Sequence, residues 1–519
     1  HRVDRRQRQM CIRDRVTGWC IAGVVVDRRA ADFCGGTRFF PAACTGCHRH
    51  QHQYRCARLQ RAAADDFASC TYPALSVTGA DPDLPTQGFA WKEGRMSMAA
   101  VSHRQRYLIW GAYVALLVFA PLIFTQSAAL SLLCQMGTFI IFALSYNMLL
   151  GQGGMLSFGH AVYSGLGAFC AIHAINLVAA GNLHIPITLI PLVGGIAGLF
   201  FGALFGYVTT RKSGTTFAMI TLGIVELVFA CSLMFPEFFG GEGGIFTDRV
   251  VGEAFFGITY GPQIEVYYLI AAWLLVSTVA MYAFTQTPLG RIINAVRDNP
   301  ERAEFVGYDP QWVRYLTLML SAFFAGISGA LTAINFEIVS AENVSALRSG
   351  MILLFTFIGG TGFFFGPIIG AIVGVFLTVV LSNYTNAWQL YLGVFFVLLV
   401  MLAPGGIAGL LMQFVHLLRH RKLRKMAQPL LLVGVAAALM LFGFVVLVEM
   451  LYHLSLNARH GTTLTLAGWM LDTAQPFSWL TALLPLALGA LLWWRVRPRL
   501  QQAWTAVNLE IENAMQVVP

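Results

Sequence analysis

NMLLGQGGMLSFGHAVYSGLGAF, residues 147–169, places a cluster of glycines between two apolar segments. The glycines interrupt the first segment, and small residues with a histidine open the second. Glycine weakens a helix, and amides freed at the start of a broken membrane helix can face an anionic group. The stretch therefore predicts a discontinuous helix whose candidate substrate-path residues are Gly151, Gly154, Ser157, Gly159 and His160. The alternative is a tight turn with close helix packing, in which His160 is a hydrogen-bonded packing residue.

A second glycine-rich stretch repeats this pattern late in the chain, in FIGGTGFFFGPIIGAIVGVF, residues 357–376. Two interrupted apolar segments in separate halves of a membrane protein are a pointer to a translocation path. Gly360, Gly362 and Gly366 are therefore further candidates for the path, and helix packing without substrate contact is the compatible alternative.

Composition places the chain in a membrane, since 57% of its residues are hydrophobic and 11% are charged. About 20 apolar residues cross the roughly 30 Å of bilayer hydrocarbon. The sequence predicts an all-α polytopic membrane protein, a helical bundle with discontinuous glycine-rich helices. Spans are expected near residues 107–125, 128–150, 158–180, 187–208, 215–235, 265–285, 314–334, 350–362, 366–383, 388–404, 428–450 and 477–494.

Basic residues predict the orientation of the spans. They concentrate in the loops that lie inside if residues 350–383 form two passes, above all in RHRKLRK, residues 419–425. The outside loops then carry only Arg249, Arg348 and Arg459. The positive-inside rule thus predicts cytoplasmic termini. The basic residues of the membrane part sit in these short loops between apolar spans, so the net charge of +9 indicates no nucleic-acid partner.

Residues 1–95 differ from the rest because they contain no membrane span and no helical or alternating periodicity. They include CTGCH, residues 44–48, which matches the pattern of covalent haem attachment and could also offer zinc ligands together with His50 and Cys56. The opening VDRRQRQMCIRDR, residues 3–15, resembles a translated sequencing adapter. We expect residues 1–95 to be non-native or disordered, without a metal or haem.

Glu226 is a rare acidic residue in the middle of a predicted span. A carboxylate at membrane depth is costly unless it is paired or faces water, so we expect Glu226 to face the bundle interior as a further candidate for the path. The scarcity of such groups argues against a proton-coupled secondary transporter. The core also shows neither paired carboxylates nor metal-spaced histidines, which a membrane enzyme would need.

The longest inside loop between spans is TPLGRIINAVRDNPERAEFVGYDPQWVRY, residues 287–315. Its apolar residues suggest a docking site for another protein. We expect Gly290–Pro310 to form a short helix along the cytoplasmic membrane surface, with Arg297, Asp298, Glu301 and Arg302 accessible. Its apolar contacts are expected from Ile292, Ala295, Val296, Phe305 and Val306.

Four segments in order give a specific resemblance. LLGQGGMLSFGHAVYSGLGAF, GRIINAVRDNPERAEFVGYD, FIGGTGFFFGPIIGAIVG and LGVFFVLLVMLAPGGIAGLL resemble the permeases of branched-chain amino-acid ABC importers, the LivM-like group. The resemblance covers about residues 105–412, so residues 96–412 are expected to form the ABC permease domain and 413–519 an extension with two further spans.

The resemblance implies a bacterial inner-membrane subunit that works with a LivH-like second permease, two ATP-binding subunits and an external substrate-binding protein. It also implies that the inside loop couples to the ATPase, through Gly290, Arg291, Ala295, Val296, Arg297, Asn299, Glu301, Ala303, Phe305 and Gly307. The chain itself has no phosphate loop: the nearest approach, GYVTTRKS (residues 206–213), has Arg211 at the second glycine position. No catalytic residue, metal or cofactor is therefore expected here, and urea or short amides remain alternative substrates.

Overall fold

The computed structural model describes residues 19–21, 24–26, 103–251, 259–419, 423–456, 463–466, 469–472 and 475–516. The chain forms two compact units, His1–Ala100 and Val101–Pro519. In the first unit, the described residues form strands β1 (Trp19–Ile21) and β2 (Val24–Val26), which pair antiparallel. CTGCH and most of residues 1–95 lie outside the described residues, so the expectations about them stay predictions.

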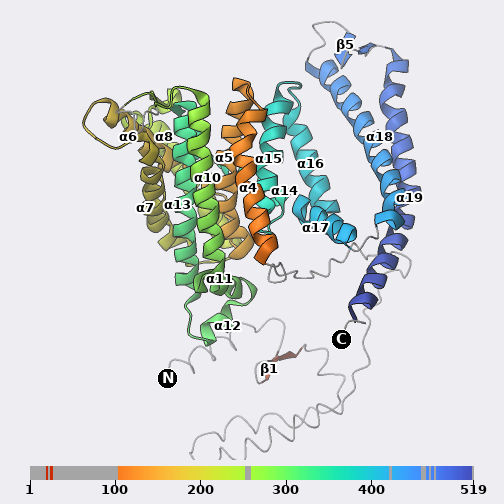
Figure 1. The fold of residues 1–519 in the computed structure, drawn as a ribbon, viewed down its shortest axis with the longest axis horizontal. Coiled ribbons are helices and arrows are strands. Elements are labelled where there is room, and N and C mark those ends of the chain that lie inside the picture. The colour runs from red at the N-terminus through yellow and green to blue at the C-terminus, as the bar shows by residue number, and fades with distance from the viewer. Residues whose placement is uncertain are drawn as a thin grey trace, which may run out of the picture. The chain divides into compact units, whose positions relative to one another are not determined.

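The second unit consists mainly of helices (Figure 1). Among the described residues, eight helices are long and apolar enough to cross a membrane, or up to nine spans if the bent pair α16–α17 counts as one. This confirms the predicted all-α polytopic fold. The α-helices are α4 (His103–Ile123), α5 (Ser127–Asn147), α6 (His160–Ala179), α7 (Ile190–Thr209), α8 (Thr215–Met234), α9 (Pro236–Phe239), α10 (Gln263–Gln286), α11 (Pro288–Asp298), α12 (Pro300–Phe305), α13 (Pro310–Phe336), α14 (Ala346–Gly359), α15 (Gly366–Val375), α16 (Trp388–Leu402), α17 (Gly406–Arg419), α18 (Leu423–Leu456) and α19 (Pro476–Gln516).

Short elements join these helices. Two are π-helical turns, η2 (Met148–Gln152) and η6 (Phe376–Val380). Three are 3₁₀ turns, η3 (Ile187–Leu189), η4 (Gly241–Gly243) and η5 (Ala341–Val344). Two further antiparallel pairs join strands β3 (Ile245–Phe246) with β4 (Ile338–Val339) and β5 (Thr463–Leu466) with β6 (Trp469–Asp472).

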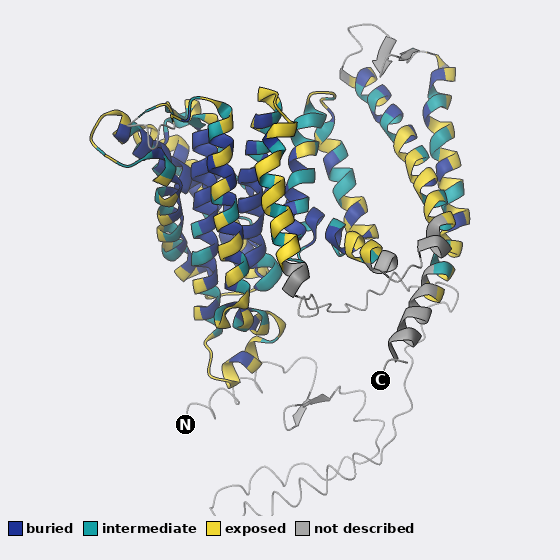
Figure 2. Ribbon diagram, in the orientation of Figure 1, coloured by how far each residue is buried: buried dark blue, intermediate teal, exposed yellow. Residues whose placement is uncertain are grey.

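The interior of the bundle is formed by α5, α6 and α13, which Figure 2 shows largely in the colour of buried residues. Of the apolar 18-residue stretch by which each helix could cross the membrane, 78% is buried in α6 and in α13, against 33% in α8. Glycines permit this density: a methyl group added at Gly326 of α13 would lie 2.1 Å from the Gly194 carbonyl oxygen of α7. Small residues allow membrane helices to approach closely in this way, where dispersion and backbone contacts replace hydrophobic burial.

Helices α14 and α15 are shorter than a full span. The 14 residues of α14 rise about 21 Å, against the roughly 30 Å of a bilayer core. Gly360 ends α14 with φ +105°, a conformation that favours glycine, and Pro367 stands in the first turn of α15. The predicted late discontinuity is therefore present in the structure.

The C-terminal helices α18 and α19 form a hairpin that packs mainly on itself. Gly443 of α18 contacts α19, because a methyl group there would lie 2.6 Å from the Ala482 carbonyl oxygen. Only 17% of the apolar 18-residue stretch of each of these two helices is buried. The Tyr391 hydroxyl of α16 donates a 3.0 Å hydrogen bond to Glu449 Oε1 of α18, which joins the hairpin to the preceding helices.

Candidate functional site

The first glycine-rich stretch breaks the chain between α5 and α6. Helix α5 ends at Asn147, η2 follows, and residues 153–159 run without helical structure to His160. Gly154 has φ +63°, so this position favours glycine over any residue with a side chain. The structure thus contains the predicted break and places the start of α6 in the buried core, since His160 and Ala161 are both fully buried.

His160 lies in an aromatic cage at this start. Its ring stacks on Phe142 at 5.5 Å and meets Tyr146 and Tyr163 edge-on. The Ser145 hydroxyl donates to the Phe142 carbonyl, so it is free to accept from His160 Nε2 at 3.0 Å. This arrangement assigns the proton of a neutral ring to Nε2 and favours the packing interpretation of His160.

The segment before α6 is anchored to two other helices. The Phe158 amide donates a 3.1 Å hydrogen bond to Thr221 Oγ1 of α8, and the Ala161 amide donates at 2.9 Å to Ser349 Oγ of α14. Gly159 allows the first contact, because a methyl group there would lie 2.4 Å from the Thr221 carbonyl oxygen. The predicted residues around Gly159 therefore position the first turn of α6 between α8 and α14.

The break is polar as well as buried. Among the described residues, four buried atoms between positions 147 and 160 have no hydrogen-bond partner: Asn147 Oδ1, Gln152 Oε1, Ser157 Oγ and His160 Nδ1. Buried polar atoms are almost always satisfied in folded proteins, so such a cluster is suited to hydrogen bonding with water or a polar solute.

The two glycine-rich breaks meet at Gly151. A methyl group at Gly151 would lie 2.6 Å from the Thr361 carbonyl oxygen, which belongs to the turn between α14 and α15. In that turn Gly366 packs against Gly360, and Gly360 packs against Gly405 of the following turn, while Gly362 is exposed. Gly360 and Gly366 thus serve close backbone packing, and contact of these glycines with a substrate stays a prediction.

The loop predicted to be cytoplasmic forms two short helices, α11 and α12, beyond one end of the bundle (Figure 1). Thr287 caps α11, and Asn299 caps α12 by accepting from the Arg302 amide at 3.0 Å. Gly307, at φ +98°, follows α12. The loop is expected to form one or two short amphipathic helices, and the structure has two, separated where Pro300 follows the extended Asn299.

A small apolar cluster holds this segment against the bundle through buried Ile293, Val296, Ala303 and Val313. The prediction that Ala295, Phe305 and Val306 make apolar contacts is wrong within this chain, because all three are exposed. Ala295 lies off the face formed by Ile293 and Val296, and Phe305 and Val306 close α12 beyond the cluster. The expected exposure of the charged residues is confirmed for Arg297, Asp298, Glu301 and Arg302, and Arg291 is exposed as well.

Arg297 connects this segment to the helix break. Its Nη1 donates a hydrogen bond to the Gly151 carbonyl oxygen, and its aliphatic stem fills the space beside Gly154. A methyl group at Gly154 would lie 2.7 Å from Arg297 Cγ. Asp298 holds the other side of the guanidinium through a 3.1 Å ion pair. Arg297 therefore connects α11 to Gly151, the glycine at which the two breaks meet.

The family model of the permease component of branched-chain amino acid transport systems matches residues 128–405, which include both breaks and the α11–α12 segment. The chain belongs to this family. It is 27% identical over 290 residues to the high-affinity branched-chain amino acid permease LivM of Escherichia coli, covering 52% of this chain and 67% of that protein.

Other relatives include a sugar permease and a second branched-chain amino acid permease. The permease is 26% identical over 239 residues to the fructose import permease FrcC of Rhizobium meliloti, covering 40% of this chain and 60% of that protein. It is 24% identical over 289 residues to the probable branched-chain amino acid permease LivH of Methanocaldococcus jannaschii, covering 52% and 88%. No solved structure gives a significant match.

Glu226 of this permease does not face the bundle interior, and the prediction that it does is wrong. Helix α8 packs through buried Thr221, Val225 and Val228, whereas Glu226 and Leu227 are exposed on its other side. The helical phase explains the error, since consecutive residues turn by about 100° and Glu226 follows directly after the buried Val225. Glu226 therefore does not lie inside the helical bundle of this chain.

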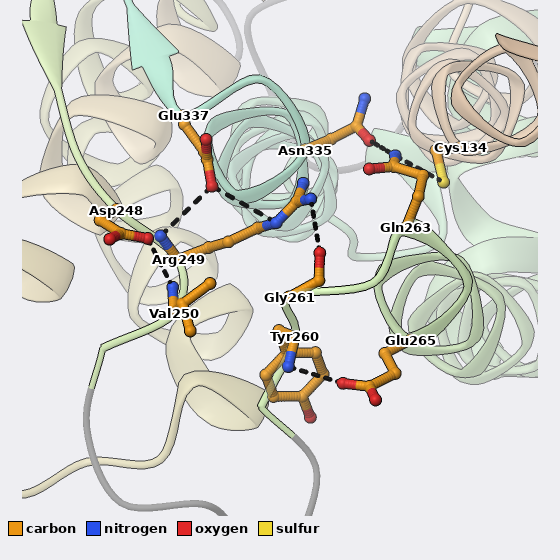
Figure 3. Close-up of polar contacts among 10 residues, drawn as sticks. All are labelled: Cys134, Asp248, Arg249, Val250, Tyr260, Gly261, Gln263, Glu265, Asn335 and Glu337. Carbon is orange, nitrogen blue, oxygen red and sulfur yellow. Dashed lines mark hydrogen bonds and ion pairs between the residues drawn. The ribbon is translucent and has the colours of Figure 1, made fainter. Parts of the chain in front are cut away.

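A polar cluster at the opposite end of the permease was not predicted (Figure 3). Arg249 forms a 3.3 Å ion pair with Glu337 and donates to the Gly261 carbonyl oxygen at 3.2 Å. Gln263 of α10 donates to Asn335 Oδ1 of α13 at 2.9 Å and also reaches Cys134 of α5. These contacts fasten the loop before α10 to the end of α13, and the first residue of α10 to α13 and α5.

The backbone of this cluster is unusual too. Among the described residues, Tyr260 and Glu337 are the non-glycine residues with positive φ, at 58° and 57°. The Tyr260 amide donates to Glu265 Oε2 at 2.7 Å, and Glu337 binds Arg249, so polar contacts hold both strained residues in place. Sequence could point to this site only through Arg249, one of the few basic residues of the predicted outside loops.

Proposed function

We propose that this ABC permease imports branched-chain or other hydrophobic amino acids, forming the translocation path and receiving ATPase motion through α11–α12. It works with a LivH-like second permease, two ATP-binding subunits and an external substrate-binding protein. The complex lies in the inner membrane of a bacterium, with both termini of this chain in the cytoplasm. ATP is consumed by the partner subunits, so this chain needs neither a catalytic residue nor a cofactor.

The observation that carries the proposal is the apolar tip of α12. Phe305 is 89% exposed and Val306 is 75% exposed, while Ala303 on the same short helix is buried against the bundle. A fixed stem with an unpaired apolar tip suits insertion into a cleft of another protein. Arg302 and Glu301 flank the tip and are exposed, which adds polar contacts around an apolar centre.

The path from this tip to the membrane interior is short. Movement of α12 shifts α11, with which it shares the cluster of Ile293, Val296 and Ala303. Arg297 of α11 is bonded to Gly151 at the first break, and Gly151 touches Thr361 at the second. An ATPase that moves α12 would thus act on both breaks, whose unpaired polar atoms suit passage of a zwitterion.

Substitution of the tip tests the proposal. In the complete complex, Phe305→Asp should abolish co-purification of the ATP-binding subunits and leave the permease at normal levels in the membrane. Val296→Asp is less informative, because Val296 is buried and a charge there would disturb folding. Phe246→Asp is the matched control, since Phe246 is 69% exposed at the end of the bundle opposite α12.

Transport measurements separate the alternatives. ATP-driven import requires that leucine uptake by proteoliposomes stops with a non-hydrolysable ATP analogue. Uptake that continues under this condition, together with retained ATPase binding and uptake by Phe305→Asp, would indicate an ATP-independent transporter. Uptake of urea or short amides without leucine would retain the ABC mechanism and replace the substrate.

A further inference from the structure

Arg348 is a basic residue inside the bundle that the sequence placed in an outside loop. It stands in the first turn of α14 and is only partly exposed, with its Nε buried and without a hydrogen-bond partner. Its Nη1 donates a 2.6 Å hydrogen bond to Asn343 Oδ1 of η5. Among the described residues, no carboxylate forms an ion pair with it; Glu342, six positions earlier, is exposed and acts on its charge only from beyond ion-pair distance.

The depth of Arg348 follows from the ring on which it lies. Its guanidinium carbon is 5.5 Å from the centroid of the Phe139 ring. Phe139 is the thirteenth residue of α5, about 18 Å along the helix from Ser127 at 1.5 Å per residue. A cation at such depth in a membrane protein is costly and marks a functional site unless an anion accompanies it.

The neighbouring backbone adds to the positive potential. Ser349, the next residue, accepts from the Ala161 amide, so the N-terminal turn of α6 adjoins that of α14. Asn343 lies against α6 as well, because a methyl group at Gly165 would be 2.7 Å from its carbonyl oxygen. Both helices exceed eight residues and direct the positive ends of their dipoles to this region. Ser164 of α6 is fully buried, and its hydroxyl has no partner among the described residues.

We propose that Arg348 binds the carboxylate of the transported amino acid, with Phe139 and Phe355 packing beside its apolar side chain. The two rings lie 5.6 Å apart and both are buried, so they form an apolar wall next to the cation. This inference rests on the proposed amino-acid function and narrows it. A molecule must carry an anionic group together with an apolar part, a requirement that urea, short amides and neutral sugars do not meet.

A purely structural role accounts for less of the geometry. One hydrogen bond to Asn343 and one aromatic face occupy part of a group that has five N–H donors. A carboxylate can accept two of the remaining donors in parallel, as arginine–carboxylate pairs usually do. The same pair would neutralise the charge during transport.

Uptake by the complete reconstituted importer provides the first test. Arg348→Gln should raise KM for leucine at least about tenfold, the loss expected for one charge-assisted hydrogen bond, and Arg348→Lys should lie between it and the wild type. Arg211→Gln is the matched control, because Arg211 also stacks on an aromatic ring, 4.6 Å from the Tyr207 centroid, and is exposed. It should leave KM unchanged.

A ligand panel on the wild-type complex without the external binding protein gives an independent test that needs no variant to fold. Leucine and 4-methylpentanoate, which carry the carboxylate, should raise the melting temperature, whereas 3-methylbutylamine should not. Equal stabilisation by the amine, or none by the acid, overturns the assignment.

The two failures are distinguishable. If the wild type imports leucine and Arg348→Gln has the same KM, the assignment of Arg348 is wrong and the amino-acid function stands. If the wild type imports no amino acid, the proposed function itself is wrong.

Discussion

At the scale of single residues, Gly151 and Arg297 form the contact with the largest consequence. Arg297 lies 146 positions from Gly151, yet its guanidinium bonds the carbonyl oxygen of the glycine. Gly151 has no side chain to block the turn of α14 and α15, and Gly154 leaves space for the arginine stem. One side chain thus links the segment proposed to bind the ATPase to the interrupted membrane helix.

Arg297→Ala should uncouple transport from ATP hydrolysis while the ATP-binding subunits still co-purify, because the apolar tip of α12 is unchanged. A hydrogen bond to a charged group contributes about 1.5–3 kcal/mol, and the exposure of Arg297 reduces this value. We therefore expect leucine uptake per ATP hydrolysed to fall about threefold to tenfold in proteoliposomes.

Lys212→Ala provides the comparison, since Lys212 is an exposed cation in the turn between α7 and α8, outside the α11–α12 segment. This variant should import as much leucine per ATP hydrolysed as the wild type. An unchanged ratio in Arg297→Ala would show that the bond to Gly151 transmits nothing.

Single residues also show where sequence reasoning ends. The glycine breaks were predictable because glycine acts locally on the backbone. Glu226 was misplaced because one sequence gives the period of a helix but not the phase at which it meets its neighbours. Arg348 was missed for a related reason: its depth depends on η5 packing against α6, a contact between distant segments.

At the scale of helices, the contact between α13 and α7 depends on glycine. Gly326 meets Gly194 and Gly198, and Gly167 of α6 approaches the same point. Hydropathy predicted each of these spans within a few residues. It could not predict which helices touch, because lipid chains and helix side chains are equally apolar and the contact is decided by shape.

Gly326→Ala should destabilise the permease, because the added methyl group would meet backbone atoms of α7 that cannot rotate away. Overpacking of this kind costs about 1–3 kcal/mol, so the midpoint of thermal unfolding in detergent should fall by a few degrees (~2 °C per kcal/mol for a chain of this size). Gly223→Ala is the control, since nothing lies within 4 Å of the methyl group that it would add in α8. Equal midpoints for the two variants would contradict the packing argument.

At the scale of the whole molecule, the residues that the family model matches and the residues that pack into the bundle end at nearby positions. The match closes at residue 405, while α17 still packs on the second break through Gly406 and Gly360. The hairpin α18–α19 follows and is mostly exposed. Hydropathy predicted its two spans, but its contact through Tyr391 and Glu449 joins two residues that nothing in the sequence pairs.

A chain that ends after Arg419 should insert and import leucine at close to the normal rate, because the hairpin packs mainly on itself. A chain that ends after Leu402 should be lost from the membrane, because it also removes α17 and uncovers Gly360. Immunoblots of membrane fractions together with uptake measurements test both. Loss of the longer chain would show that α18–α19 is needed for the fold.

The contacts at Gly151 also bear on how the two breaks could move relative to each other. Arg297 donates a hydrogen bond to the carbonyl oxygen of Gly151, and the carbonyl oxygen of Thr361 packs beside the α-carbon of the same glycine. Neither half-helix can swing without displacing that glycine or breaking one of these contacts. If the two breaks open during transport, they would share this one contact point, so opening one without the other would first require the contacts at Gly151 to break.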